Sequence, residues 1–168
     1  IAMLIIAFVG LGATAYSIPY LREETSKQII GFTRVRQYFV LLHLFIAAMF
    51  LAVTSASPIF TWISIEATTL STAFLISFYN KPSALEAAWK YLIINSIGLL
   101  LGFFGTLLYF TSLETTGERG IATWSTLLSH TTHLDPIIAK IAFIFVLIGY
   151  GTKMGLAPMH TWIPDAHG

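Results

Sequence analysis

Residues 149–168 read GYGTKMGLAPMHTWIPDAHG and follow a continuous apolar run, IAFIFVLI, at residues 141–148. The run is typical of a helix surrounded by lipid, whereas the segment after it places a lysine, Lys153, in the same stretch. The glycines and prolines around Lys153 disfavour a continuous helix. Unwound backbone at membrane depth persists only where it is buried in protein or lines a cavity, and transporters place ion sites at such breaks. We therefore predict a discontinuous membrane helix with its lysine at the break.

The composition of the whole chain is that of a membrane protein. Hydrophobic residues make up 56% of the 168 residues and charged residues 10%, whereas a soluble domain of this size carries roughly 25% charge. The formal net charge of +1 gives no electrostatic footprint for nucleic acid. The chain has no cysteine, which excludes thiolate-bound iron–sulfur clusters and disulfides from this stretch. No metal-ligand, nucleotide-binding or nucleophile constellation is visible, so we expect no catalytic residue, cofactor, metal site or nucleic-acid partner here.

Long apolar runs separated by polar segments predict an all-α, polytopic transmembrane helix bundle that forms a single membrane domain over residues 1–168. The expected spans are residues 1–21, 38–55, 58–79, 91–111 and 137–157. We interpret the chain as part of a longer polytopic protein, and its first apolar run as a span rather than a signal peptide.

The distribution of positive charge predicts the orientation of these spans. One membrane face is flanked by Arg22, Lys27, Arg34, Arg36, Lys81 and Lys90. The opposite face has Arg119, with Lys140 close to its border. Cytoplasmic loops are enriched in Lys and Arg, so the first face is predicted to be cytoplasmic, and the expected location is the inner membrane of a prokaryotic cell.

Small and polar residues recur at helical spacing in two of the expected spans. The fourth span carries Asn95, Gly98, Gly102 and Gly105, and the third carries Ser64, Thr68, Ser71 and Thr72. Small residues let helix backbones approach closely, and hydroxyl and amide groups bond between helices. Ordinary packing within the bundle is our main interpretation of both stripes, and contact with a water-filled path is the alternative.

Glu66, in WISIEATTLSTAFL, is the clearest single candidate for chemistry. At 1.5 Å per helical residue it lies roughly 12 Å from Pro58 and roughly 20 Å from Tyr79, near the middle of a bilayer. A carboxylate at that depth costs at least about 2.5 kcal/mol on insertion scales, so it is normally paired, protonated or in contact with water. We interpret Glu66 as a proton site; the alternative is a neutral glutamic acid that is hydrogen-bonded inside the bundle.

Lys153 is the basic counterpart of Glu66. The helix from Ile137 to Thr152 is about 24 Å long, short of the roughly 30 Å hydrocarbon core. A short, tilted helix would let Lys153 reach the cytoplasmic interface, but the glycines and prolines around it favour a position within the membrane. At an effective dielectric constant near 20, unit charges about 7 Å apart interact by about 2.4 kcal/mol. Each residue can therefore control the protonation of the other, and we predict that the pair relays protons.

A weaker set of residues forms candidates for the rest of a proton pathway: Lys90, His43, His160, Asp165 and His167. Lys90 begins the fourth span, where snorkelling to the interface is the preferred interpretation. For His43, near the cytoplasmic end of the second span, packing and proton transfer are equally open. The remaining three flank the predicted helix break. There, caps and hydrogen bonds to the unwound backbone are preferred over proton delivery.

Two segments are similar to a known family. KMGLAPMHTWIPDAH, residues 153–167, resembles the seventh-helix motif of the antiporter-like membrane subunits of respiratory complex I. The same motif occurs in Mrp-type cation/proton antiporters and membrane-bound hydrogenases. WISIEATTLSTAFLISFYNKPSALEAAWKYLIINSIGLLLGFFGTLLY, residues 62–109, resembles the fifth and sixth helices, most of all in the large membrane subunit of formate hydrogenlyase and group 4 hydrogenases. The resemblance covers essentially the whole chain and implies that it corresponds to about helices three to seven.

The resemblance implies roles for particular residues. Glu66 matches the fifth-helix glutamate of the family, which is described as pairing with a lysine. Lys153 matches the lysine of the discontinuous seventh helix. Some complex I relatives carry an arginine and an aspartate on the sixth helix, where this chain has Ser96 and Leu99. That difference favours the hydrogenase-like branch of the family.

Members of this family move protons, or exchange them for sodium, usually inside a complex whose peripheral subunits do the redox chemistry. The resemblance thus implies a proton- or cation/proton-translocating membrane subunit of a respiratory-type oxidoreductase complex, either hydrogenase- or formate hydrogenlyase-like or NADH:quinone oxidoreductase-like. Its expected partners are other membrane and peripheral subunits, membrane lipid, and H⁺ or Na⁺. The alternatives are a stand-alone Mrp-type Na⁺/H⁺ antiporter subunit, and a structural anchor in which Glu66 and Lys153 only hold helices together.

Overall fold

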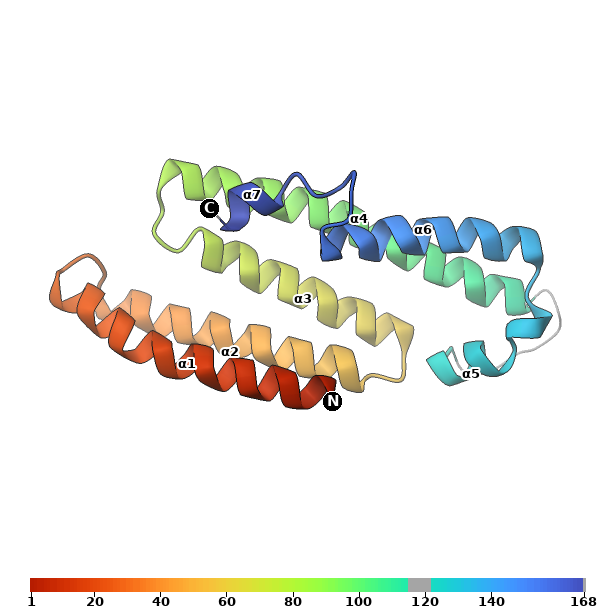
Figure 1. Cartoon of the computed structure of the whole chain (residues 1–168), viewed down its shortest axis with the longest axis horizontal. Helices are drawn as coiled ribbons and strands as arrows, with labels where there is room; N and C mark the ends of the chain where they lie inside the picture. The colour runs from red at the N-terminus through yellow and green to blue at the C-terminus, as the bar shows by residue number, and fades with distance from the viewer. Residues whose placement is uncertain (115–121, 168) are drawn as a thin grey trace.

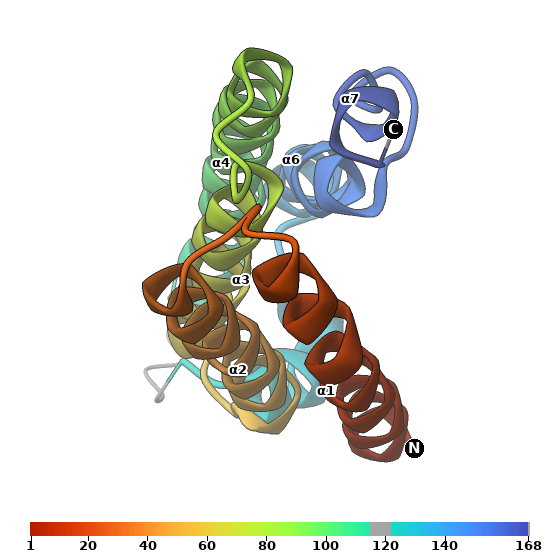
Figure 2. The ribbon, with the colours of Figure 1, turned by 90° about the vertical axis from the view of Figure 1, so that its left-hand side faces the viewer.

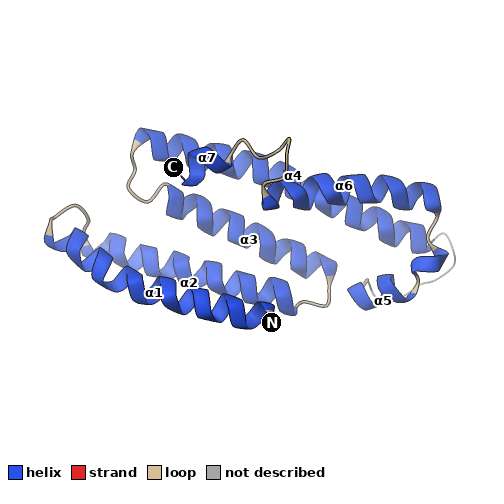
Figure 3. Cartoon of the chain, viewed as in Figure 1, coloured by secondary structure: helices blue, strands red, loops and turns tan. Residues whose placement is uncertain are grey.

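Helices make up the secondary structure of this chain. The computed structural model describes residues 1–114 and 122–167, and no strand occurs among them (Figure 3). The long helices are α1 (Ala2–Ser26), α2 (Phe32–Thr54), α3 (Pro58–Ile76), α4 (Pro82–Glu114) and α6 (Pro136–Met154). The short elements are α5 (Trp124–Ser129), the 3₁₀ helix η1 (Thr131–His133) and α7 (Ile163–His167).

The five long helices are long and apolar enough to cross a bilayer. A helix satisfies its own backbone hydrogen bonds, which the lipid interior cannot do for it. The predicted all-α polytopic bundle is thus confirmed. Helices α1, α2 and α4 extend several residues beyond the apolar ranges read from the sequence, most of all α4, which begins at Pro82. Its first turns, SALEAAWK, are rich in strong helix formers, and proline is favourable at the first helical position.

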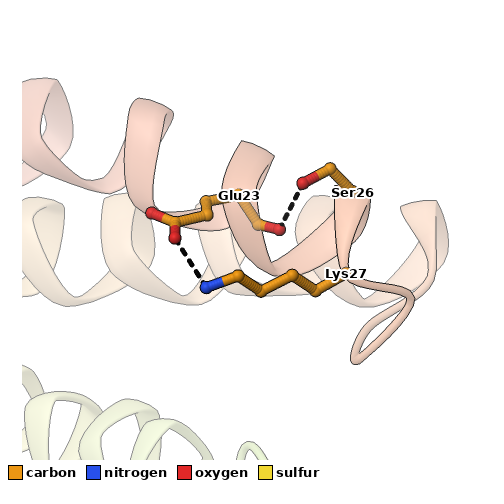
Figure 4. Close-up of polar contacts among 3 residues, drawn as sticks. All are labelled: Glu23, Ser26 and Lys27. Carbon is orange, nitrogen blue, oxygen red and sulfur yellow. Dashed lines mark hydrogen bonds and ion pairs between the residues drawn. The ribbon is translucent and has the colours of Figure 1, made fainter.

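The last turn of α1 is polar and marks the end of its apolar run. The ammonium of Lys27 lies 2.6 Å from the Glu23 carboxylate, and the Ser26 hydroxyl donates to the Glu23 carbonyl at 2.7 Å (Figure 4). Both charged side chains are more than half exposed. The hydrogen bond and attraction to Glu23 raise the pKa of Lys27. This end of α1 therefore suits an aqueous membrane border.

The long helices pack largely in the order of the chain. α1 contacts α2, α2 contacts α3, α3 contacts α4, and α4 contacts α6 and α7 (Figure 1). Viewed end-on, α1 and α2 lie at one end of this row and α4 and α6 at the other, with α3 between them (Figure 2). The row therefore places α3 and α4 at its centre.

The contact between α4 and α6 depends on glycine. A Cβ atom added at Gly98 would lie 2.5 Å from the Thr152 Cβ, and one added at Gly105 would lie 2.7 Å from the Ala142 carbonyl oxygen. A Cβ added at Gly149 of α6 would overlap the backbone N and Cα atoms of Gly102. The glycine stripe of the fourth span thus packs against another helix, as predicted, because small residues allow this backbone approach.

The predicted break in the last long helix is confirmed. α6 ends at Met154, and Gly155 follows with a left-handed φ of +80°. The N–H groups of Gly155 and Leu156 donate to the carbonyls of Thr152 and Gly151, at 3.1 and 2.9 Å. This arrangement closes the helix and leaves residues 155–162 outside any helix before α7 begins.

Candidate functional site

Lys153 lies in the last turn of α6, next to the break, and its ammonium is directed into the bundle. Its Nζ donates to the Thr69 hydroxyl of α3 at 2.9 Å and to the Tyr91 hydroxyl of α4 at 2.6 Å. It also lies 5.0 Å from the centroid of the Tyr91 ring. Thr69 is 0% exposed and Tyr91 4%. The side chain thus joins α6 to α3 and α4.

Glu66 lies on α3, half-buried. Its Oε1 accepts a 2.5 Å hydrogen bond from the Ser96 hydroxyl of α4. Its Oε2 is buried and has no hydrogen-bond partner among the described residues. A buried acceptor left unsatisfied costs about 1–3 kcal/mol and calls for an explanation, such as a functional role or an unseen water.

Glu66 and Lys153 belong to one polar cluster, which we define as Glu66, Thr69, Tyr91, Ser96 and Lys153. The carboxylate and the ammonium form no direct ion pair within the described part of the chain. Glu66 and Thr69, the partner of Lys153, are three residues apart on α3, which is about 4.5 Å along the helix. Tyr91 and Ser96 are separated by about 7.5 Å along α4. The Glu66–Ser96 contact and the contacts of Lys153 with Thr69 and Tyr91 therefore lie near each other along α3 and α4, and no hydrogen bond among the described residues joins one to the other.

Trp162 covers the cluster from the segment that follows the break. Its indole Nε1 donates to the Thr152 carbonyl at 3.1 Å. Its ring packs edge-on against Tyr91 at 5.1 Å between centroids, and the residue is 7% exposed. The Thr152 carbonyl, in the last turn of α6, thus accepts from two donors, the Gly155 N–H and the Trp162 indole. The indole contact holds residues 155–162 against the aromatic partner of Lys153.

The weaker candidates lie outside the polar cluster. Lys90 is near the start of α4, half-exposed, and pairs with Glu86 at 2.8 Å and with Asp165 of α7 at 3.0 Å. His160 is exposed, and its carbonyl accepts from the Ile163 N–H. The structure thus gives Lys90 and Asp165 a mutual contact that connects α4 with α7.

His43 is separated from the cluster. It is exposed on α2, its Nδ1 lies 2.7 Å from the Phe39 carbonyl, and it borders an apolar groove formed with α1. The His167 side chain lies outside the described residues. His43 therefore does not join the candidate site.

Sequence reasoning missed four residues of this arrangement: Thr69, Tyr91, Ser96 as a partner of Glu66, and Trp162. A signal was present for Thr69, because residues three apart on a helix share a face and Thr69 follows Glu66 at that spacing. Tyr91 stood at the edge of an apolar run, where an interfacial tyrosine is common. Its role as an acceptor for Lys153 became visible only with α4 and α6 in contact.

The cluster contains one ammonium, one carboxyl group and three hydroxyls, all of which form hydrogen bonds. Hydroxyl groups both donate and accept hydrogen bonds, so each can accommodate either protonation state of its neighbour. Within the residues described, no group of three His, Asp or Glu side chains is placed to hold a metal ion.

Comparison with known proteins adds an independent observation. Residues 55–168 match the family described as NADH:quinone oxidoreductase/Mrp antiporter, transmembrane region. This match covers α3, α4, α6 and α7, and with them all five residues of the polar cluster.

Individual relatives agree with the family match. The chain is 38% identical over 98% of its length to a hydrogenase-4 component F homolog of Methylacidiphilum infernorum. It is 29% identical over 80% of its length to NADH-quinone oxidoreductase subunit N of Helicobacter hepaticus. It is 33% identical over 76% of its length to NADH-ubiquinone oxidoreductase chain 2 of Varanus baritji. These matches cover 35%, 27% and 32% of the relatives, so the chain spans about a third of their length.

Proposed function

The chain belongs to the NADH:quinone oxidoreductase/Mrp antiporter membrane family, and from that premise we propose that it is part of an ion-translocating subunit of a membrane-bound redox complex. It is a multi-pass integral membrane protein. The names of the relatives, a hydrogenase component and subunits of NADH-quinone oxidoreductases, favour a redox complex over a stand-alone Mrp-type antiporter. Its partners would be the other subunits of that complex, in the inner membrane of a prokaryotic cell.

The observation that carries this proposal is the position of Lys153. Placing an ammonium half-buried among three helices, next to a helix break, costs free energy. Such residues within membrane spans are rare and usually have a function. The ammonium uses two of its three N–H groups on Thr69 and Tyr91. The third is left for water or for another proton acceptor.

In the proposed mechanism, Glu66 and Lys153 load and unload protons in turn. A proton that arrives at Glu66 neutralises its carboxylate and removes the attraction that helps to keep the positive charge on Lys153. Lys153 then gives its proton to the water or other acceptor at its third N–H group. The Thr69 and Tyr91 hydroxyls, which accept from the ammonium, can rotate and donate to the neutral amine. Ser96 can likewise donate to the ionised Glu66 or accept from its protonated form.

The decisive experiment measures proton translocation by the full-length protein in its assembled complex, in sealed vesicles. We expect Lys153→Ala and Glu66→Ala to lower proton transport per substrate turnover at least about tenfold, with assembly and electron transfer retained. Lys140→Gln is the matched control, because Lys140 is on the same helix but exposed. Unchanged proton transport in an assembled Lys153→Ala complex would contradict the relay.

Two further measurements separate the alternatives. If Glu66 and Lys153 only anchor helices, then Glu66→Gln and Lys153→Gln will keep full proton transport, because each can still form hydrogen bonds. If the protein is an Mrp-type antiporter, proteoliposomes that lack any redox partner will exchange Na⁺ for H⁺.

A further inference from the structure

A groove lies where α2, α3 and α4 approach each other near the loop at residues 77–81. It has a volume of about 590 Å³, and its polar wall includes Arg34, Arg36 and Asn80. The guanidinium of Arg34 contacts the side-chain amide of Asn80. Because α3 ends and α4 begins at this loop, the polar mouth of the groove lies at a membrane border, away from the Lys153 cluster.

The groove continues into an apolar trough between α3 and α4. The trough has a volume of about 150 Å³ and shares Phe74, Ser77 and Leu85 with the polar mouth. The remainder of its wall is apolar: Leu70, Ala73, Ala88, Trp89 and Leu92. From Ser77 to Leu70 the trough follows α3 for about 10 Å towards the membrane interior. One continuous depression thus has a cationic end and an apolar end.

The positive charge at the mouth is not neutralised within the described residues. Neither Arg34 nor Arg36 forms an ion pair there, and no Asp or Glu belongs to the wall. Arginine matches phosphate oxygens with paired N–H groups. Basic pockets between membrane helices at a membrane surface bind anionic lipid headgroups.

We propose that this groove binds an anionic glycerophospholipid. Its phosphate lies at Arg34 and Arg36, and one acyl chain follows the trough along Phe74, Leu85 and Leu92. A free phosphate ion would leave the apolar trough uncovered. An apolar helix from another part of the protein would leave two cationic side chains without a counter-charge. A phospholipid satisfies both ends of the groove and connects the start of α2 with the α3–α4 loop.

The test is lipid retention by the full-length protein, purified and then given an equal mixture of phosphatidylglycerol and phosphatidylcholine, and read by native mass spectrometry. We expect the natural protein to retain phosphatidylglycerol selectively, and Arg34→Gln/Arg36→Gln to lower that retention on the order of tenfold. The matched control, Arg22→Gln/Lys27→Gln, removes the same charge near the same membrane face but outside the groove, and should leave retention unchanged.

A second variant tests the apolar end independently. Ser77→Trp fills the junction of mouth and trough while both arginines remain, and should lower phosphatidylglycerol retention to a similar extent. Equal retention of both lipids by the natural protein, as expected if other parts of the chain cover the groove, would overturn the proposal. So would a control variant that loses as much lipid as Arg34→Gln/Arg36→Gln.

Discussion

The α1–α2 pair and the α4–α6 pair are both built from apolar helices, yet they pack very differently. α1 buries only Gly10, Ser17 and Leu21, and leaves large apolar side chains such as Phe8 81% exposed. α4 and α6 bring their backbones into contact at Gly102 and Gly149. Lipid is as apolar as leucine, so apolar side chains alone give no preference for another helix over lipid.

The two pairs also differ in the polar groups that they bury. A single hydrogen bond between the Ser17 and Tyr38 hydroxyls, at 2.9 Å, joins α1 to α2 through side chains in the described chain. Beside the α4–α6 contact lie Asn95, Thr106 and Thr152, all 2% exposed or less, and the Lys153 cluster. Small residues and buried polar groups, rather than hydrophobicity, therefore distinguish the tight region from the loose one.

The largest expected effect on stability comes from adding a methyl group to the α4–α6 contact, compared with the same addition to α1. Gly149→Ala should lower the free energy of unfolding by about 3 kcal/mol, because its Cβ would meet the Gly102 backbone, which cannot rotate away. Gly12→Ala in α1 is the control, since nothing lies within 4 Å of an added Cβ there. It should be neutral or stabilising by up to about 1 kcal/mol. Reversible unfolding of the full-length protein in mixed detergent measures both, and equal effects would refute the comparison.

A smaller effect is expected from removing one hydroxyl inside the tight region. Tyr91→Phe keeps the ring against Trp162 but removes one of the two hydroxyl acceptors of Lys153. It should lower the free energy of unfolding by about 1–2 kcal/mol and slow proton transport. Tyr150→Phe is the control, because the Tyr150 hydroxyl is buried and has no hydrogen-bond partner among the described residues. It should leave stability and transport unchanged or slightly improved. A Tyr91→Phe protein with natural transport would remove Tyr91 from the proposed mechanism.

The smallest effect is expected at the exposed ion pair between α4 and α7. Asp165→Asn breaks the contact with Lys90, but both side chains are more than 40% exposed, where solvent and salt screen the attraction. We expect a shift in the unfolding midpoint close to the error of measurement, and none at high salt. Glu86→Gln removes the other partner of Lys90, which lies on the same helix. It should shift the unfolding midpoint by as little as Asp165→Asn does. Loss of proton transport in Asp165→Asn alone would instead assign this pair to the pathway.

The polar stripe of α3 illustrates how far sequence reasoning reached into the candidate site. It singled out Ser64, Thr68 and Ser71, whose hydroxyls donate to carbonyls of their own helix, at 2.7, 2.6 and 2.8 Å. It passed over Thr69, whose hydroxyl accepts from Lys153. Serine and threonine can satisfy themselves on their own helix backbone, so their presence in an apolar span does not reveal which of them has a partner on another helix.

The sequence by itself determined that five long apolar helices follow one another and that the last of them is interrupted near Lys153. Each of these depends on one segment alone, because a helix in lipid satisfies its own hydrogen bonds and rises a constant distance per residue. Only the tertiary structure decided that Lys153 meets Thr69 and Tyr91, and that Ser96 meets Glu66. Lipid accommodates every apolar face equally well, so neighbours are chosen by the close fit of small residues on helices far apart in the chain, as at Gly102 and Gly149.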